Sequence, residues 1–598
     1  MNREKVEEIY KWDLTALYPN EVDWENEFLE VQEKLPSFQP FEGNLNDATT
    51  LYNCLFLDEA LSLKVERLYV YASLKRDEDT RNNNSQRFVE KVSSLSARYY
   101  ETTSFIIPEI LNIQESELEN FYLKEQRLIH YKKQLTTLFR DKVHVLSDTE
   151  ERLLASISET RGTASDIFSA LENADMVFPS IELPSGEKVE LTQSNYYVYI
   201  KHNDRSVREH AYKALYHTYM NYRNTISKTL SSHIKENVVY SSLRKYPSAL
   251  EKSLFHDDIP KEVYTQLIST TKKHLPTLVN YMNIRKKLLG LSQLEMWDLS
   301  VPLLNDYNKI INYEEAYNDV LEGLQVLGTD YVELLKRAKK ERWIDVYENA
   351  GKRGGAYAWG AYGTHPYVLL NHKDDIGSLF TLAHELGHAL HSYYSDESQS
   401  YTYAQYVIFV AEVASTVNEV LVMEYLLEKA KASQDLELEK YLLNYFLEQF
   451  KSTVFRQVMF AEFELLTHEQ AEKGEPLTAD DFKDIYGALH KEYHGGAVIQ
   501  GEEITYEWMR IPHFYTPFYV YKYATGFSAA IAIAKAIREE GAPAVTRYKE
   551  FLRSGGTDFP IELLKKAGVD MSSSKPVDEA LSYFSTLVER FQQLTSAN

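Results

Sequence analysis

The chain has 598 residues, with 65 basic and 89 acidic side chains, and so carries a formal charge of −24. Its 44% hydrophobic and 26% charged residues exclude an intrinsically disordered chain. The acidic balance argues against non-specific nucleic-acid binding, which needs basic surface to replace phosphate counterions. Cys54 is the only cysteine, so an internal disulfide is excluded and a reducing cytoplasm is favoured. The 45 tyrosines are an excess that composition does not explain.

Targeting and membrane signals are absent from the sequence. The opening residues MNREKVEEIYKWDL contain no apolar core of signal-peptide length. The longest apolar stretches are residues 407–423 and 527–537. The first contains two glutamates, and the second is too short. Neither reaches the ~20 apolar residues of a membrane helix. We therefore expect a cytoplasmic protein without a membrane segment.

Most of the chain has the apolar spacing of α-helices, beginning with residues 1–170. A β-hairpin is expected next, because alternating segments at 177–183 and 188–192 flank the turn sequence Pro-Ser-Gly-Glu. Helical spacing resumes over residues 206–289. The glycine-rich stretch 351–371 ends in Tyr-Val-Leu-Leu and predicts one or two short strands. Helices follow from 374 to 474 and, after a loop with three glycines near residue 500, to the end.

The strongest chemical signal is His384-Glu385-Leu386-Gly387-His388, which matches H-E-x-x-H. On a helix, residues i and i+4 lie one above the other, so two imidazoles can bind one Zn²⁺. The adjacent Glu385 can then take a proton from the attacking water. The alternative is two histidines on an ordinary half-buried helix. The glycine at 387 indicates either that another backbone or a substrate comes close or that the helix packs tightly.

The flanking residues support a buried helix from Ile376 to Tyr394. Asp374 or Asp375 is the expected N-cap, and leucines at three- and four-residue intervals form an apolar face. Buried histidines need polar partners, which a metal supplies. His391, one turn after the motif, either orients a ligand or is a surface or packing histidine.

A third zinc ligand is expected in the apolar run 407–423, whose only charged residues are Glu412 and Glu419. A carboxylate inside such a helix is costly unless it is paired or bound to a metal. We assign Glu412 as the third ligand, which completes a His₂Glu set. Glu419 lies two turns further on the same face, where it either accepts a hydrogen bond from a ligating imidazole or pairs with a Lys or Arg.

Such a site would hydrolyse an amide bond, with Glu385 as general base. The oxyanion that develops needs hydrogen-bond donors, and the segment from His513 to Tyr523 is the densest source of histidine and tyrosine. We expect Tyr519 and Tyr523, at i and i+4, to share a helical face. Ordinary core aromatics are the alternative interpretation.

At these residues the chain resembles oligoendopeptidase F, within the thimet-oligopeptidase-like zinc metallopeptidases. The resemblance covers most of the chain, and the segments that carry it are Asp204–Arg208, Trp343–Asp345, Gly351–Tyr357, Gly363–Asn371, His384–His391, Phe409–Glu419 and His513–Gly526. The spacing from His513 to Tyr519 is one residue longer than in thimet oligopeptidase, and Gly526 stands where a further tyrosine is expected.

The resemblance implies a mainly α fold with two helical lobes around a deep substrate channel, a zincin-type active-site helix, a small β-hairpin and short edge strands. It implies an N-terminal helical lobe, residues 1–190, and a catalytic zinc metallopeptidase domain, residues 191–598. One Zn²⁺ per chain would be held by His384, His388 and Glu412. The remaining roles are catalytic for Glu385, His513, Tyr519 and Tyr523, and substrate-binding for Gly355, Tyr357, His365 and Tyr367.

The activity that the resemblance implies is cleavage of internal bonds in short peptides. From its charge and hydropathy, the protein is expected to bind neither nucleic acid nor membranes. Two other interpretations stay open: a zinc carboxypeptidase or dipeptidyl carboxypeptidase on a similar fold, and a peptide-binding protein without hydrolysis. The sequence carries no signal for the oligomeric state.

Overall fold

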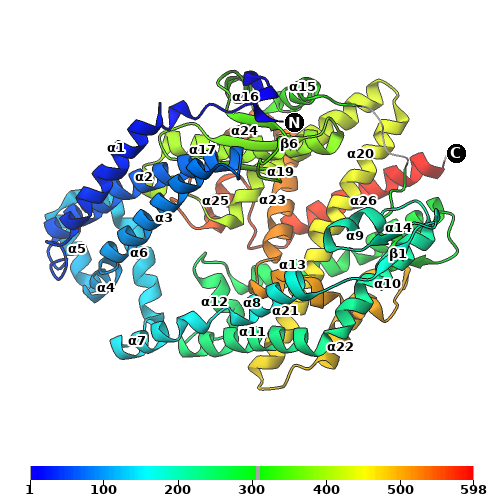
Figure 1. Cartoon of the computed structure of the whole chain (residues 1–598), viewed down its shortest axis with the longest axis horizontal. Helices are drawn as coiled ribbons and strands as arrows, with labels where there is room; N and C mark the ends of the chain where they lie inside the picture. The colour runs from blue at the N-terminus through cyan, green and yellow to red at the C-terminus, as the bar shows by residue number, and fades with distance from the viewer. Residues whose placement is uncertain (1, 305–309, 597–598) are drawn as a thin grey trace. The chain divides into compact units, whose positions relative to one another are not determined.

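A computed structural model describes residues 2–304 and 310–596 and is mainly helical (Figure 1). The chain forms two compact units, each built from three separate segments. Unit 1 comprises Met1–Val143, Lys309–Leu426 and Ile533–Val569, and unit 2 comprises His144–Asn308, Leu427–Ala532 and Asp570–Asn598. The mainly α fold is confirmed. The functional division at residue 190 and the channel between lobes stay predictions.

Unit 1 joins a layer of N-terminal helices to a small sheet and the helices that follow it. Its elements are α1 (Glu21–Lys34), α2 (Ala48–Glu78), α3 (Asn83–Thr103), α4 (Ile106–Asn112), α5 (Glu115–Lys124), α6 (Lys132–Asp141), α15 (Tyr313–Gly323), α16 (Thr329–Lys340), β4 (Ile344–Tyr347), β5 (Tyr357–Trp359), β6 (Tyr367–His372), α17 (Ile376–Ser398), α18 (Tyr401–Ala404), most of α19 (Ile408–Ala432), the end of α23 (Tyr521–Glu540), α24 (Ala542–Arg553) and α25 (Pro560–Lys566).

Unit 2 is a helical array with two very small sheets. Its elements are α7 (Asp148–Ser156), α8 (Thr163–Ala170), β1 (Ser180–Glu182), β2 (Lys188–Glu190), α9 (Gln193–Tyr199), α10 (Arg205–Asn221), α11 (Arg223–Leu243), α12 (Ala249–Phe255), α13 (Lys261–Lys273), α14 (Leu275–Leu288), β3 (Leu294–Glu295), α20 (Leu436–Gln449), the π-helix η11 (Phe450–Phe455), α21 (Arg456–Glu472), α22 (Ala479–His494), β7 (Val498–Ile499), the 3₁₀ helices η12 (Glu503–Arg510) and η13 (Pro512–Tyr515), and α26 (Lys575–Ser596).

The expected strands are present, and those of the hairpin are shorter than predicted. β1 and β2 pair antiparallel around the Pro-Ser-Gly-Glu turn. In unit 1 the strand order is β4-β6-β5, with β6 parallel to β4 and antiparallel to β5. β5 therefore lies at an edge of the sheet. β4 was not predicted as a strand, because four residues with three of them buried give no periodicity that separates a strand from a helix.

Buried tyrosines join helices inside each unit by their hydroxyl groups. In unit 1, the Tyr317 hydroxyl donates to the carbonyl of Leu335 at 2.7 Å. In unit 2, the Tyr264 hydroxyl donates to the carbonyl of Ala461, also at 2.7 Å. The rings bury apolar area while the hydroxyl satisfies a backbone acceptor. This dual use accounts for part of the tyrosine excess.

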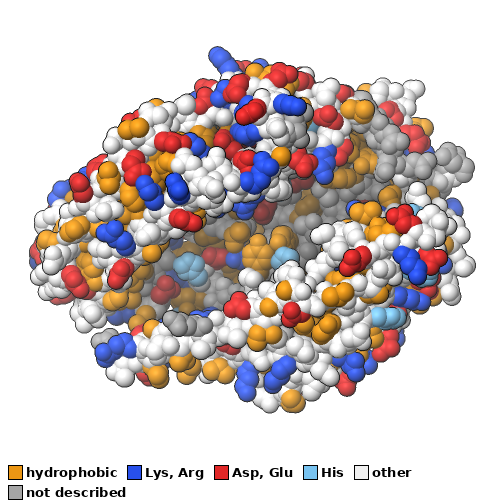
Figure 2. All heavy atoms as spheres, in the orientation of Figure 1, with side chains coloured by type: hydrophobic (Ala, Val, Ile, Leu, Met, Phe, Trp, Pro, Cys, Tyr) orange, Lys and Arg blue, Asp and Glu red, His pale blue; other side chains and the backbone are white. Residues whose placement is uncertain are grey.

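The surface carries charges of both signs. Acidic and basic side chains are interspersed on the face drawn in Figure 2. Neither sign of charge forms a separate patch among the described residues of this face (Figure 2). No helix among the described residues combines the length and the apolar character needed to cross a bilayer.

Candidate metal centre

The H-E-x-x-H motif lies in the middle of α17, as predicted. Asp375 is the N-cap, and its carboxylate accepts the N–H of Ser378 at 2.7 Å. Asp374, the other candidate, lies outside the helix with φ +54°. The leucines at 379, 382, 386 and 390 are fully buried. This apolar face anchors the helix and leaves His384 and His388 partly exposed.

Gly387 allows α19 to cross α17 at very short range. A Cβ at this position would lie 2.5 Å from the Cα of Ser415 and 2.8 Å from the carbonyl oxygen of Ala414. Only a residue without a side chain permits this approach. The glycine is therefore explained by close contact with another helix backbone. The crossing also fixes where Glu412, one turn before Ser415, meets α17.

Two polar contacts hold α17 and α19 in register beside the crossing. The Asn418 side chain donates to the carbonyl of Ala383 at 3.2 Å, and its oxygen accepts the Tyr331 hydroxyl at 2.9 Å. Asn418 and Tyr331 are fully buried, so buried hydrogen bonds link α16, α17 and α19. Sequence analysis missed both residues. The uncharged polar Asn418 inside the apolar run was the available signal.

Three donor atoms converge where the two helices meet. The Nε2 atoms of His384 and His388 are 3.2 Å apart, and Oε2 of Glu412 lies 3.4 Å from the first and 3.5 Å from the second. In the described ranges, 2–304 and 310–596, this is the one group of His, Cys, Asp and Glu side chains with the spacing to hold a metal ion. The sequence predicted these three residues.

The donor spacing matches the requirements of zinc. Zn²⁺ binds nitrogen and oxygen at ~2.0–2.1 Å in tetrahedral geometry, which places its ligand atoms about 3.3–3.4 Å apart. The observed triangle of 3.2, 3.4 and 3.5 Å fits this value. The three side chains keep 27%, 18% and 39% of their surface exposed, so the donors face accessible space. An accessible three-donor set is typical of a catalytic rather than a structural zinc site.

Glu419 orients the first imidazole. Nδ1–H of His384 donates to Oε1 of Glu419 at 2.7 Å, which leaves the lone pair of the neutral ring on Nε2, toward the other donors. Burial disfavours the charged form of His384. The hydrogen bond to Glu419 and the nearby carboxylates outweigh burial and raise the pKa of the ring to about 9. The surrounding negative charge therefore favours a cation at this place.

Glu385 is 6% exposed and lies on the same helix between the two histidines. Burial raises the pKa of its carboxyl, and the charges of His384 and His388 oppose that shift. A carboxylate with a raised pKa is a better proton acceptor near neutral pH. This environment suits the role of general base that the sequence predicted.

His513, Tyr519 and Tyr523 form a cluster in unit 2. The Tyr523 hydroxyl lies 3.4 Å from Nε2 of His513, and the two tyrosine rings contact edge to face at 5.4 Å. The expected shared helical face is wrong, because α23 begins at Tyr521 and Tyr519 precedes it. Phe518, with φ +54°, turns the chain so that Tyr519 still meets the other two. The catalytic role of the cluster stays a prediction.

The predicted substrate-side residues occupy the β5–β6 region of unit 1. Tyr357 opens the edge strand β5, and its hydroxyl donates to Asp77 of α2 at 2.8 Å. His365 stacks on Trp343 at 4.9 Å, and the Tyr367 side chain is fully buried. Gly355 is exposed with φ +83°. The outer side of β5 is an edge of this sheet, so a peptide that contacts it there would do so through backbone pairing.

His391 is a packing residue. It is 1% exposed and stacks on Tyr406 at 3.7 Å. Burial lowers the pKa of its ring to about 3, so the imidazole is neutral. The surface interpretation is excluded.

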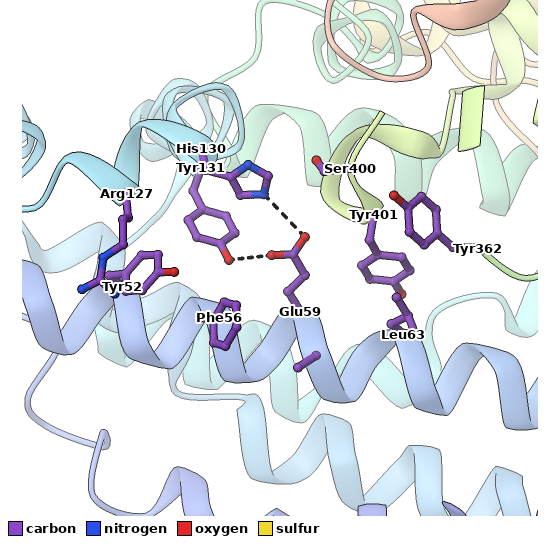
Figure 3. A pocket seen from close by; sticks show the side chains of 11 residues that line it. Tyr52, Phe56, Glu59, Leu63, Arg127, His130, Tyr131, Tyr362, Ser400 and Tyr401 are labelled. Atoms are coloured by element: carbon purple, nitrogen blue, oxygen red, sulfur yellow. Dashed lines mark hydrogen bonds and ion pairs between the residues drawn. The ribbon is translucent and has the colours of Figure 1, made fainter. Parts of the chain in front are cut away.

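Unit 1 also contains an open cavity of about 550 Å³ lined by α2, the segment 126–131 and the start of α18. In Figure 3 the carboxylate of Glu59 on α2 points toward Tyr131 and His130. The Tyr131 hydroxyl donates to this carboxylate at 2.6 Å, and Nε2 of His130 lies 3.5 Å from it. Tyr362 and Tyr401 stand on the other side of Glu59 in the same view. None of the predicted site residues lines this cavity.

Comparison with known proteins identifies the family. Residues 198–583 match Peptidase family M3, and residues 109–178 match the family described as Oligopeptidase F. The chain is 43% identical to Oligopeptidase PepF of Bacillus subtilis, over 99% of this chain and 88% of that protein. It is 40% identical to Group B oligopeptidase PepB of Streptococcus agalactiae, over 100% and 98%.

A solved structure agrees with these matches. The crystal structure of oligoendopeptidase-F from Enterococcus faecium superposes with a TM-score of 0.75 and is 36% identical, over 97% of this chain and 100% of that one. Together with the H-E-x-x-H helix and its third carboxylate, these similarities show that the chain belongs to peptidase family M3, in its oligoendopeptidase F group, and is a metallopeptidase.

Proposed function

We propose that the chain is a zinc-dependent endopeptidase that hydrolyses internal bonds of short oligopeptides in the cytoplasm. The observation that carries this proposal is the donor triangle of His384, His388 and Glu412, with edges of 3.2–3.5 Å, next to the buried Glu385. These three residues would hold the ion. Bound zinc polarises the scissile carbonyl and lowers the pKa of water to ~7.

The chain's own residues perform the proton transfers. Glu385 takes a proton from the attacking water and passes it to the leaving amine. Glu419 holds the tautomer and orientation of His384 through the 2.7 Å hydrogen bond. By their resemblance to the family, His513, Tyr519 and Tyr523 donate hydrogen bonds to the developing oxyanion.

Substrate would be held by main-chain pairing. The outer edge of β5 is suited to an extended peptide, because β-strand addition uses backbone groups and so tolerates many side chains. Gly355, just before the strand, leaves the approach free of a side chain. Tyr357, His365 and Tyr367 would support the strand through their packing, since their contacts are with the protein.

An end-blocked, internally quenched peptide separates this activity from the carboxypeptidase alternatives. The endopeptidase is expected to cleave such a peptide, and a chelator is expected to stop the cleavage. An exopeptidase needs a free terminus and would leave the peptide intact. Mass spectrometry of a mixed peptide pool would then give the cleavage positions. Cleavage that persists after the metal is removed would contradict the proposal.

A further inference from the structure

Unit 2 contains a second cavity of about 430 Å³, lined by α9, α10, η11, α21, α22 and η12. This volume is within the range of small-molecule sites. Every lining residue belongs to unit 2, whereas the proposed metal ligands belong to unit 1. The π-helix η11 provides part of the wall, and such irregular helical turns are frequent at functional sites.

Two buried polar side chains of this wall have no hydrogen-bond partner within the described part of the chain. His490 is 1% exposed, and both of its ring nitrogens are unpartnered. Tyr212 is 3% exposed, and its hydroxyl is also unpartnered. Native proteins normally satisfy buried polar groups. A ligand in the cavity would provide the missing partners.

The cavity lining carries more basic than acidic side chains: Lys201, Lys451, Arg456 and Arg510 against Glu448 and Glu507. Glu507 pairs with Arg456 at 2.7 Å and accepts the hydroxyl of Tyr486 at 2.5 Å. Burial opposes ionisation, but the charges of Arg456 and Arg510 and the hydrogen bond from Tyr486 outweigh it and lower the pKa of Glu507 to about 2. Lys451 pairs with Glu448, which also pairs with Arg285 at 3.1 Å. The acidic groups of the wall are therefore neutralised.

Arg510 is the lining arginine without an ion-pair partner among the described residues, although the charge of Glu507 acts on it from a distance. Its guanidinium lies over the rings of Tyr196 and Tyr216 at 5.2 and 5.9 Å and donates to the Tyr197 hydroxyl at 3.3 Å. It forms no ion pair with any carboxylate of the described residues. Tyr216 lies between Arg510 and the unpartnered Tyr212, because the Tyr216 ring also contacts the Tyr212 ring at a centroid distance of 4.5 Å. Within the described ranges, the cavity thus offers an arginine without an ion pair, two unpartnered hydrogen-bonding side chains and aromatic walls.

We propose that this cavity binds a small organic carboxylate with an aromatic or aliphatic body, which pairs with Arg510 and hydrogen-bonds His490 and Tyr212. A guanidinium donates bidentately to a carboxylate, whose single negative charge it balances. The tyrosine walls suit an apolar body. The carboxylate can be that of a free acid or the C-terminus of a peptide. The site does not depend on the proposed peptidase mechanism.

Isothermal titration of the full chain with phenylacetate tests the site. We expect one binding event per chain, with the neutral isostere phenylacetamide at least about tenfold weaker, because it loses the charge-assisted hydrogen bonds. Inorganic phosphate is the second probe, and preferential phosphate binding would overturn the carboxylate assignment. Equal binding of the acid and the amide would do the same.

Substitutions locate the binding event. Arg510→Gln is expected to weaken phenylacetate at least about tenfold. Tyr212→Phe is expected to weaken it severalfold without lowering the melting temperature, because the hydroxyl has no protein partner to lose. Arg223→Gln, an exposed arginine of α11, is the matched control and should change nothing. Unchanged affinity in both Tyr212→Phe and Arg510→Gln would refute the proposal.

An N-acetylated tripeptide ending in phenylalanine, as acid and as amide, distinguishes the two sources of carboxylate. The Glu385→Gln background prevents cleavage during the titration. If the peptide acid binds in an Arg510-dependent way and phenylacetate does not, the ligand is a peptide C-terminus. If neither acid binds, the proposal fails, and the peptidase proposal is unaffected.

Discussion

Gly387→Ala tests whether the close crossing of α17 and α19 builds the metal centre. The added Cβ would lie 2.5 Å from Cα of Ser415, and the next two contacts, at 2.8 and 2.9 Å, are also with backbone. Backbone atoms cannot rotate away as a side chain can. Because carbon atoms pack at ~3.5–4.0 Å, the helices must separate by about 1 Å at this point.

Two energies of opposite sign determine how much the substitution changes the free energy of unfolding. Overpacking of this kind costs ~1–3 kcal/mol, and the higher helix propensity of alanine returns ~1 kcal/mol. With three backbone contacts inside 3.0 Å we expect the upper part of that range, and so a net loss of about 1–2 kcal/mol of unfolding free energy. A displacement of ~1 Å also carries Glu412 away from the histidines, and zinc affinity should fall about 10–100-fold, as for loss of a supporting contact.

The assay is denaturant unfolding of the metal-free protein, together with zinc titration against a competing chelator. Gly377→Ala is the matched control on the same helix, because its Cβ would meet only the Asp375 side chain at 3.4 Å, an ordinary contact. We expect that control to be neutral or slightly stabilising. If Gly387→Ala equals Gly377→Ala in both stability and zinc affinity, the crossing does not build the site.

Other predictions address the second carboxylate, a buried acid and a buried ion pair. Glu419→Gln should weaken zinc binding about 10–100-fold with the fold intact, because the acceptor that orients His384 becomes neutral; unchanged affinity in a chelator competition would contradict this. Burial raises the pKa of Glu464 to about 8, so the folded state retains a proton that the unfolded state has released above pH ~4.5. The burial of this carboxyl therefore lowers the free energy of unfolding more and more as pH rises to 8. In urea unfolding, the stability of Glu464→Gln relative to the wild type should increase between pH 5 and 8; a difference that stays constant with pH would refute this prediction. Asp298→Ala leaves the buried guanidinium of Arg208 without its 2.8 Å partner and should cost ~3–5 kcal/mol in the same assay, whereas a loss below ~1 kcal/mol would show that the pair is dispensable.

The local parts of the site could be predicted from the sequence. His384 and His388 follow from one helical period, and the N-cap and apolar face of α17 follow from residues within two turns. Glu412 could be assigned because a carboxylate in an apolar run needs a partner. Each of these inferences depends on chemistry within a single segment.

Features that depend on contacts between distant segments could not be predicted. The role of Gly387 was left open between two alternatives, because the choice depends on where α19 crosses. Tyr519 was wrongly placed on a helix, since a turn at Phe518 with positive φ leaves no periodic signal. The cavity of unit 2 joins residues from 196 to 510, and nothing local marks Arg510 as the lining arginine that has no ion pair with the described residues.

Glu385→Gln tests the central proposal most directly. The substitution keeps the size of the side chain and removes its ability to accept the proton. Elemental analysis of the purified variant should find one zinc per chain, as in the wild type. Cleavage of an end-blocked peptide should fall at least ~10²-fold, the usual contribution of a general base. A variant that cleaves within tenfold of the wild type, or a wild-type protein that binds no zinc, would contradict the account.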